Sequence, residues 1–272
     1  MRQRRIKGLE EKLKVYNGGR EIDPRQLKGR WNKVFAKEQP LYLELGCGKG
    51  QFASSVADAV PEHNVLAMEG NRNAMLRALQ KAARRYVDYD ASLQTGLRTT
   101  PPFEELLPFG VFSVDPEELG IPAGIPEENL TEDVENNCVY RITPNLSFVN
   151  MYLRRVGDCF AENELEGIFL NFSDPWPKAR QASRRLTHRG FLEGYRRVLR
   201  PGGYLEFKTD NEGLFRFSVE EFRETGLEIV EYTENLHAPD CTYRSAAFMT
   251  EYETKFSEAG KPIFYARVRF PD

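Results

Sequence analysis

The sequence predicts an α/β fold that binds a nucleotide-like ligand, and two observations support this. The short apolar strand 41–45 runs directly into the glycine loop Gly46-Cys-Gly-Lys-Gly50, and the next segment, 51–59, reads as a helix whose amino end faces the loop. A second strand, 64–68, ends in Glu69, about 20 residues after the loop. Strand, glycine loop, helix and a following acid are the opening of a nucleotide-binding α/β fold.

The composition is that of an ordinary soluble protein, with 40% hydrophobic and 29% charged residues in 272. The chain has no run of about 18 apolar residues and no apolar N-terminal segment, so we expect neither a membrane span nor a secretory signal. The four cysteines stand far apart without metal-ligand spacing, which indicates free thiols in a reducing cytoplasm and no metal site. They are Cys47, Cys138, Cys159 and Cys241.

The net charge of −3 is unevenly distributed along the chain. Residues 86–137 hold twelve acids and one base and carry −11, so the remainder sums to +8. Two stretches are strongly basic: 1–30 has ten Lys and Arg against four acids, and 178–200 has eight against one. These stretches could contact nucleic acid, and a solvated face is the blander interpretation of each.

Residues 1–22 show no sustained periodicity, and we expect a mobile basic arm before a domain that spans 23–272. Asp23-Pro24 is typical of a helix start, so a helix is predicted from 24 to about 37. Glu44 interrupts the first apolar strand, where a carboxylate needs a partner such as an amino or sulfonium group. Glu69 can accept both hydroxyls of a ribose. The loop is GxGxG instead of GxGxxG, which favours S-adenosylmethionine over NAD.

After a predicted helix at 72–86, the acidic segment 86–137 breaks the α/β pattern. It holds six of the sixteen prolines, so we expect an insertion of mostly irregular structure that packs through its apolar residues. The fold is predicted to resume with a strand at 138–142 and a helix at 148–156.

The stretch 167–178 combines a buried strand with a stiff turn. Its first six residues are almost all apolar, and Pro175 and Pro177 then bar regular structure. Asp174, Trp176 and Lys178 would lie at the carboxyl end of the strand, where open α/β sheets bind ligands. The stretch therefore indicates a nucleobase site, and a proline-stiffened loop with a core Trp is the alternative.

The C-terminal part predicts further helices and strands. Thr187 can cap a helix at 188–199, and Asp210 is either a functional acid or the cap of the next helix. The last two strands are expected to pair antiparallel and close the sheet. The predicted elements are a turn at 201–203, a strand at 204–208, a helix at 212–224, strands at 227–232 and 262–270, and a helix from 250 through 256.

The chain resembles the bacterial tRNA (guanine-N7-)-methyltransferases in a combination of segments. These segments are LELGCGKG, MEGN, NFSDPWPKARQASRRLT, FKTDN, and MTEYETKF with GKPIFYA. The resemblance covers about 23–85 and 138–270 and omits the acidic insertion. It implies a Rossmann-like, S-adenosylmethionine-dependent methyltransferase fold with a mostly parallel sheet, an antiparallel last strand and helices on both faces. It also implies methylation of N7 of a guanine in the tRNA variable loop by a cytoplasmic monomer or homodimer.

The resemblance carries over to individual positions. Asp174 matches the presumed catalytic acid, which also belongs to the cofactor motif. Thr143-Pro144-Asn145 stands where the family usually has Asp-Ala, so Thr143, Asn145 or backbone would contact adenine. The implied cofactor-binding residues are Glu44, Gly46, Gly48, Glu69, Asn71, Thr143, Asn145 and Asp174, and the substrate or RNA-binding residues are Lys178, Arg180, Arg184, Arg185, Asp210, Thr250, Glu251, Tyr252 and Glu253.

Two other functions stay open at this point. An NAD-dependent oxidoreductase would explain the stretch from Gly46 to Glu69 but not the basic loop after Lys178. An RNA-binding protein that has lost catalysis would fit the altered site at Thr143-Pro144-Asn145.

Overall fold

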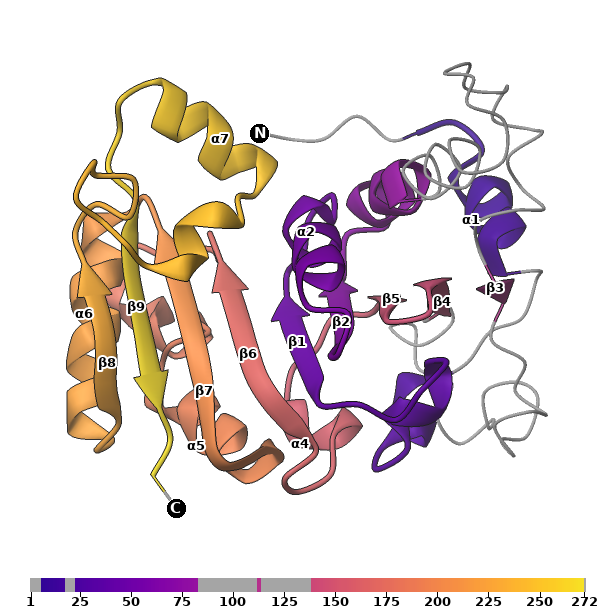
Figure 1. Cartoon of the computed structure of the whole chain (residues 1–272), viewed down its shortest axis with the longest axis horizontal. Coiled ribbons are helices and arrows are strands. Elements are labelled where there is room, and N and C mark those ends of the chain that lie inside the picture. The colour runs from indigo at the N-terminus through magenta and orange to yellow at the C-terminus, as the bar shows by residue number, and fades with distance from the viewer. Residues whose placement is uncertain (1–5, 18–22, 83–111, 114–137, 272) are drawn as a thin grey trace. The chain divides into compact units, whose positions relative to one another are not determined.

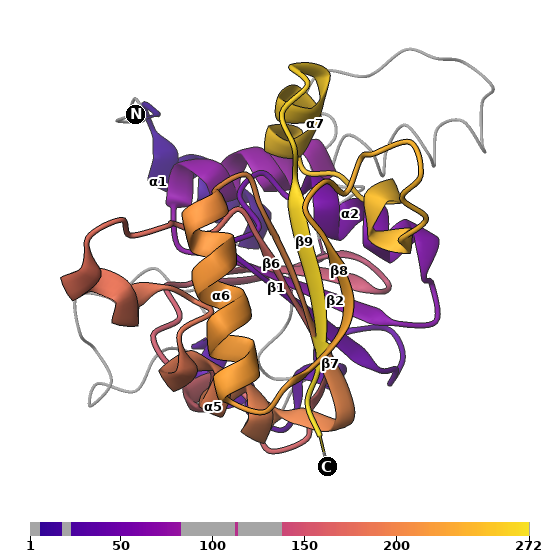
Figure 2. The ribbon, with the colours of Figure 1, turned by 90° about the vertical axis from the view of Figure 1, so that its left-hand side faces the viewer.

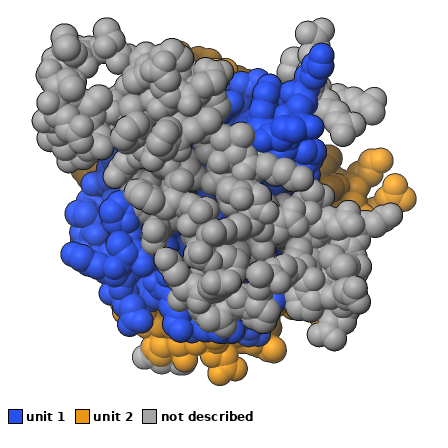
Figure 3. All heavy atoms as spheres, turned by 90° about the vertical axis from the view of Figure 1, so that its right-hand side faces the viewer, with its two compact units in different colours: residues 1–39, 47–153 blue, residues 40–46, 154–272 orange. Residues whose placement is uncertain are grey.

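A computed structural model describes residues 6–17, 23–82, 112–113 and 138–271. The chain divides into two compact units, which are coloured separately in Figure 3. Unit 1 comprises residues 1–39 and 47–153, and unit 2 comprises residues 40–46 and 154–272.

The strands of unit 1 follow one another in the order β3, β4, β5 and β2. The central pair, β2 (Asn64–Glu69) and β5 (Leu146–Asn150), is parallel, with Glu69 opposite Asn150. β4 (Cys138–Thr143) is antiparallel to β5, and β3 (Phe112–Ser113) is antiparallel to β4 (Figure 1). The strand predicted at 138–142 is confirmed, but it runs antiparallel to its neighbour β5.

The predicted helix at 148–156 is wrong, because the chain turns at Pro144 and enters β5. All five residues of β5 are buried, and three of them, Leu146, Phe148 and Val149, are apolar. A short, mostly apolar run can be a strand or part of a helix, so the sequence did not separate the two.

The helices of unit 1 include α2 (Gln51–Ala59) and residues 72–82, both predicted. Residues 9–17, expected in a mobile arm, form α1 (Leu9–Asn17), and Leu9 and Leu13 are buried. The predicted helix at 24–37 is replaced by two short 3-10 turns, η1 (Pro24–Leu27) and η2 (Trp31–Val34). Asp23 caps the first turn as expected, but Gly29 at φ 73° interrupts the helix.

The strands of unit 2 follow the order β1, β6, β7, β9 and β8. β1, β6 and β7 are parallel, and β9 lies antiparallel between β7 and β8, so the antiparallel last strand is confirmed. Parallel pairing brings the carboxyl ends of β6 and β7 together, with Asn171 opposite Lys208. The strands are β1 (Leu41–Leu45), β6 (Leu165–Asn171), β7 (Leu199–Thr209), β8 (Glu228–Thr233) and β9 (Phe264–Arg269).

The helices of unit 2 differ in how they meet the strands. α5 packs against β7, while α6 runs along the strands and packs against β7, β8 and β9 (Figure 2). α7 lies beyond the carboxyl ends of β6 and β7 (Figure 1). The elements are α4 (Val156–Cys159), η5 (Ala179–Arg184), α5 (Arg189–Val198), α6 (Glu212–Glu224), η6 (Arg244–Ala247) and α7 (Glu251–Glu258).

Two predictions about local structure in unit 2 need correction. His188, and not Thr187, caps α5, because its ring nitrogen accepts from the Gly190 amide, while Thr187 is buried against Ser218. The predicted turn at 201–203 belongs to β7, which starts at Leu199.

Two further observations concern the cysteines and the helices of the described segments. Within the described residues, Cys47, Cys159 and Cys241 form no disulfide. Among the residues described, no helix is both long and apolar enough to cross a bilayer.

Candidate functional site

The glycine loop of the chain leaves open space beside its backbone. Gly46 and Gly48 have φ of 77° and 56°, which glycine adopts without strain, and a Cβ added at either would meet nothing within 4 Å. Gly50 differs, because a Cβ there would come within 2.6 Å of Phe148. Gly50 therefore permits close packing at the start of α2, while Gly46 and Gly48 leave room for a ligand.

Glu69, at the end of β2, binds the glycine loop through its side chain. One carboxylate oxygen accepts from the Gly48 amide at 2.9 Å, and the other accepts from the Asn71 amide at 2.7 Å. The side chain of Asn71 in turn accepts from the amides of Asn73 and Ala74 and so caps the helix at 72–82. The structure thus brings together Gly48, Glu69 and Asn71, three of the residues predicted to hold the cofactor.

Asn145 lies away from this group. It precedes β5, at the amino ends of β2 and β5, and its side-chain amide donates to the carbonyls of Ala57 at 2.8 Å and His63 at 3.2 Å. Glu69 is at the opposite, carboxyl end of β2. The structure therefore does not bring Asn145 together with the group at Glu69. Thr143 lies at the same turn, opposite Leu146, and its side chain is outside the described ones.

The residues that follow β5 were missed by the sequence analysis. The side-chain amide of Asn150 donates to the backbone carbonyl of Glu69 at 2.7 Å, and Met151 donates its backbone N–H to the same carbonyl at 3.1 Å. Tyr152 is 72% exposed, and its ring lies so close to Gly70 that a Cβ there would come within 2.3 Å. The available signal in the sequence was a tyrosine two residues after a short, mostly apolar run.

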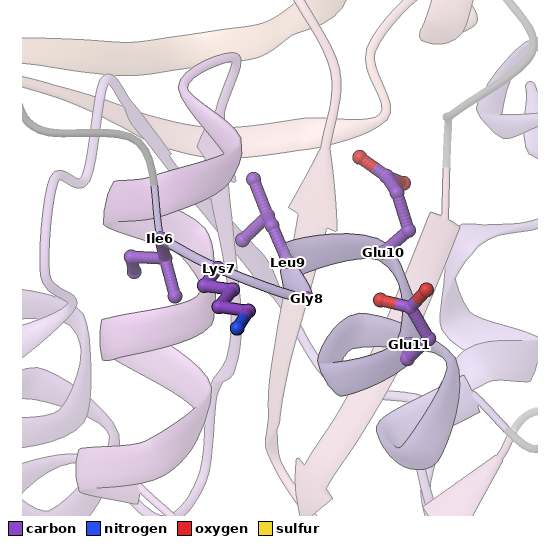
Figure 4. Close-up of a pocket in the computed structure, with 6 residues that line it drawn as sticks. All are labelled: Ile6, Lys7, Gly8, Leu9, Glu10 and Glu11. Carbon is purple, nitrogen blue, oxygen red and sulfur yellow. The ribbon is translucent and has the colours of Figure 1, made fainter.

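Another part of unit 1 is a hollow of 350 Å³ at the N-terminal segment (Figure 4). The amide of Ile6 donates to the Asn73 side chain at 3.1 Å, and Glu10 forms an ion pair with Arg72. These contacts attach the segment to the start of the helix at 72–82. The lining contains none of the predicted site residues and consists of Ile6, Lys7, Gly8, Leu9, Glu10 and Glu11.

In unit 2, the turn after β6 presents Asp174 to solvent. The Phe172 amide donates to the Lys208 carbonyl at 2.9 Å and fixes the start of the turn to β7. Phe172 and Trp176 have φ of 54° and 41°, which is uncommon for residues other than glycine. The turn is therefore held in one particular shape by its surroundings.

Arg185 provides part of this support. Its guanidinium donates to the carbonyls of Pro175 at 3.0 Å and Trp176 at 3.1 Å and lies 4.3 Å from the centre of the Phe217 ring. Arg184 is exposed and lies 4.9 Å from the centre of the Trp176 ring. The two neighbouring arginines thus differ, since Arg185 is bound to the turn and Arg184 faces solvent. Lys178 and Arg180 are also exposed.

Glu44 is 1% exposed at the end of β1. Its carboxylate accepts from the Asn171 side-chain amide at 2.9 Å, and Asn171 ends β6 just before the turn that carries Asp174. This partner partly offsets the cost of burying a carboxylate in an apolar strand. Glu44 and the Asp174 turn therefore lie at the same edge of unit 2.

Asp210 lies at the end of β7. Asn211 caps α6 by accepting from the Leu214 amide at 2.8 Å, so the capping interpretation of Asp210 is wrong. Asp210 instead accepts from the Tyr252 hydroxyl at 3.2 Å. Of the segment 250–253, Tyr252 is exposed, Thr250 and Glu251 are half-buried, and Glu253 is fully buried.

Comparison with known proteins identifies the chain. A family model described as "Putative methyltransferase" matches residues 38–94 and 127–266. A tRNA (guanine-N(7)-)-methyltransferase of Geobacillus sp. (strain WCH70) is 32% identical over 100% of this chain and 96% of its own. The chain belongs to the tRNA (guanine-N(7)-)-methyltransferase family. Relatives of the same name from Alkaliphilus metalliredigens and Lactiplantibacillus plantarum are 34% and 35% identical, over 97% and 92% of this chain and 97% and 89% of their own.

For this methyltransferase family member, the predicted α/β fold is confirmed. The family model skips residues 95–126, which lie inside the acidic insertion predicted at 86–137; apart from 112–113 that insertion is outside the described residues. Within the described segments, no group of three or more His, Cys, Asp or Glu side chains is arranged to hold a metal ion.

Proposed function

We propose that this chain transfers the methyl group of S-adenosylmethionine to N7 of a guanine in the variable loop of tRNA. The observation that carries the proposal is similarity at 32–35% identity to tRNA (guanine-N(7)-)-methyltransferases over 92–100% of the chain. Matches of that length extend over both the glycine loop and the Asp174 turn, which supports a function that uses both.

The residues at the glycine loop suit S-adenosylmethionine. The open space beside Gly46 and Gly48 lets a ligand approach the backbone, and Glu69 offers carboxylate oxygens to ribose hydroxyls. Asn71 contributes by capping the helix that follows Glu69. Asn150, Met151 and Tyr152, which lie beside Glu69, replace Thr143 and Asn145 in our proposal as the residues nearest the adenine.

In unit 2, Glu44 supplies a buried carboxylate for the positively charged end of the cofactor, and Asp174 an exposed one. When bound, the cofactor supplies a methyl group on a sulfonium, which is the electrophile of the reaction. Guanine N7 attacks with a lone pair that it already has, so no residue must remove a proton first. The role of Asp174 is therefore to orient the guanine or the methyl donor, and orientation alone can supply much of the rate.

The exposed cations after the turn suit the phosphates of RNA. Lys178, Arg180 and Arg184 project from the turn and from η5, and the Arg184 guanidinium beside Trp176 forms a surface on which an unpaired base can stack. Asp210 and Tyr252 lie at the neighbouring strand end, and in our proposal they contact the target nucleotide.

Methyl transfer to two synthetic tRNAs tests the proposal. One carries guanosine at the target position of the variable loop, and the other carries 7-deazaguanosine, which lacks N7 but keeps the Watson–Crick edge. We expect one methyl group per molecule on the first and none on the second. Equal methylation of both would assign the reaction to another atom. Binding of tRNA and cofactor without transfer would support the alternative of an RNA-binding protein that has lost catalysis.

A further inference from the structure

Lys208, near the end of β7, is a buried lysine to which the functions above assign no role. Its side chain is 1% exposed, and its ammonium donates to the carbonyls of Ser245 at 2.8 Å and Phe248 at 2.6 Å. It also contacts both carboxylate oxygens of Glu253, at 3.2 and 3.3 Å. An ammonium has three protons to donate, so these three partners use its full capacity.

A lysine in such a place is costly unless its charge is compensated. Burial lowers the pKa of the Lys208 ammonium below its usual value, and the carboxylates of Glu253, Glu206 and Glu44 oppose this shift. The three direct partners all belong to the segment 245–253, which contains part of η6 and the start of α7. One cation on the sheet therefore fixes three separate points of this segment.

Glu253 is equally committed to contacts within the protein. Its side chain has no exposed area, and one oxygen lies 2.8 Å from the His237 Nε2 atom. The other oxygen accepts from the Thr250 amide at 3.2 Å, while the Thr250 hydroxyl accepts from the Glu253 amide, which completes a capping box. A carboxylate with these partners cannot contact a substrate without giving some of them up.

The position of α7 depends on this arrangement. Of the eight residues of α7, all within the described part of the chain, Glu253 alone is buried. The exposed Tyr252 stacks on the half-buried Phe256 at 4.3 Å between ring centres and meets the half-buried Phe172 at 5.1 Å. Phe172 is two residues before Asp174, and Tyr252 also donates to Asp210. The helix start therefore connects the buried charges to the turn that carries Asp174.

We propose that Lys208 is a positioning residue for methyl transfer, which through Glu253 holds the segment Thr250–Tyr252 against Asp210 and the Asp174 turn. Glu253 is expected from the family resemblance to bind substrate. In this proposal it instead anchors the segment to Lys208 and does not touch the RNA. The inference rests on the proposed function for its kinetic consequence, but the placement of α7 can be measured independently of any reaction.

The test combines Lys208→Met and Glu253→Gln, singly and together, with Lys255→Met as a matched control on the exposed side of α7. We expect each single variant to lower the single-turnover rate at saturating tRNA and cofactor at least tenfold, with tRNA affinity within about twofold of wild type. The double variant should be no slower than the slower single variant, because both changes break one arrangement. Hydrogen exchange of amides 250–256 should accelerate in all three and stay unchanged in the control.

The proposal is overturned if the fold-loss in rate of the double variant equals the product of the two single fold-losses. It is also overturned if Glu253→Gln lowers the rate but leaves hydrogen exchange unchanged. Either result indicates direct contact with the substrate. If Lys208→Met does not fold, the double variant Lys208→Met/Glu253→Leu takes its place in the test, because it removes both buried charges together. In that pair, unchanged rate or exchange overturns the proposal. Should the wild-type chain methylate no tRNA, the proposed function fails, and the exchange measurement still decides whether Lys208 places α7.

Discussion

Arg184→Ala should weaken tRNA binding and Arg185→Ala should lower stability, although the two arginines are neighbours in a basic loop. Arg185 donates to two carbonyls of the Asp174 turn and packs on Phe217, whereas Arg184 is exposed beside Trp176. A hydrogen bond from a charged donor contributes about 1.5–3 kcal/mol when buried, and a cation–π contact about 0.5–1 kcal/mol at an exposed site. Because the Arg185 side chain is only half-buried, we take the lower ends.

With two such hydrogen bonds and one cation–π contact, Arg185→Ala should lower the free energy of unfolding by about 3–4 kcal/mol, which corresponds to a fall in melting temperature of about 6–16 °C. Arg184→Ala should change stability by less than about 0.5 kcal/mol. If Arg184 contacts one phosphate, its loss should flatten the slope of log K against log salt for tRNA binding by about 0.7–0.9.

The measurements are urea unfolding and tRNA binding at four or more salt concentrations for each variant. Arg180→Ala, in the same loop and also exposed, serves as the control and should behave like Arg184→Ala. The reasoning fails if Arg185→Ala leaves stability unchanged and flattens the salt slope as much as Arg184→Ala does, because both arginines would then be phosphate ligands.

Three further predictions concern the site and the insertion. Glu69→Gln should weaken S-adenosylmethionine binding about ten- to a hundredfold by calorimetry, through loss of charge-assisted hydrogen bonds, and an unchanged dissociation constant would refute the ribose role. Asp174→Asn should lower the single-turnover rate by a large factor with little change in melting temperature, whereas a less stable protein with near-normal turnover would remove Asp174 from the active site. Replacing 90–133, which includes the two-residue edge strand β3, with a short linker should leave a folded protein with stronger nonspecific RNA binding, and failure to unfold cooperatively would show that the segment supplies core.

The parts of the fold that the sequence predicted are those whose signal is local. The glycine loop, the helix α2 after it and the acid at Glu69 lie close together in the chain, and each has a physical requirement visible in its own residues. The run that became β5 was misassigned because a short, mostly apolar run does not distinguish a strand from part of a helix. Asn145 was expected to follow the strand at 138–142, whereas the structure also places it directly before β5, and Tyr152 was not considered.

The parts that could not be predicted depend on contacts between distant segments. Nothing in the local sequence separates Arg184 from Arg185, and the difference arises only because the chain places Phe217 and two turn carbonyls beside one of them. Likewise, the partners of Lys208 are 37 to 45 residues further along the chain. Sequence patterns identified these segments as important but did not show which side chains support and which are exposed.

The left-handed backbone at Phe172 and Trp176 has a consequence for anyone who engineers this protein. An L-residue in that conformation costs about 1–2 kcal/mol that glycine does not pay. At Trp176, whose ring is half-exposed, glycine would recover part of that strain while removing the aromatic surface beside Arg184. A screen for heat resistance weighs this strain against the packing of the half-buried ring, whereas a screen for RNA methylation also weighs the stacking surface proposed above, so the two screens need not choose the same residue at position 176.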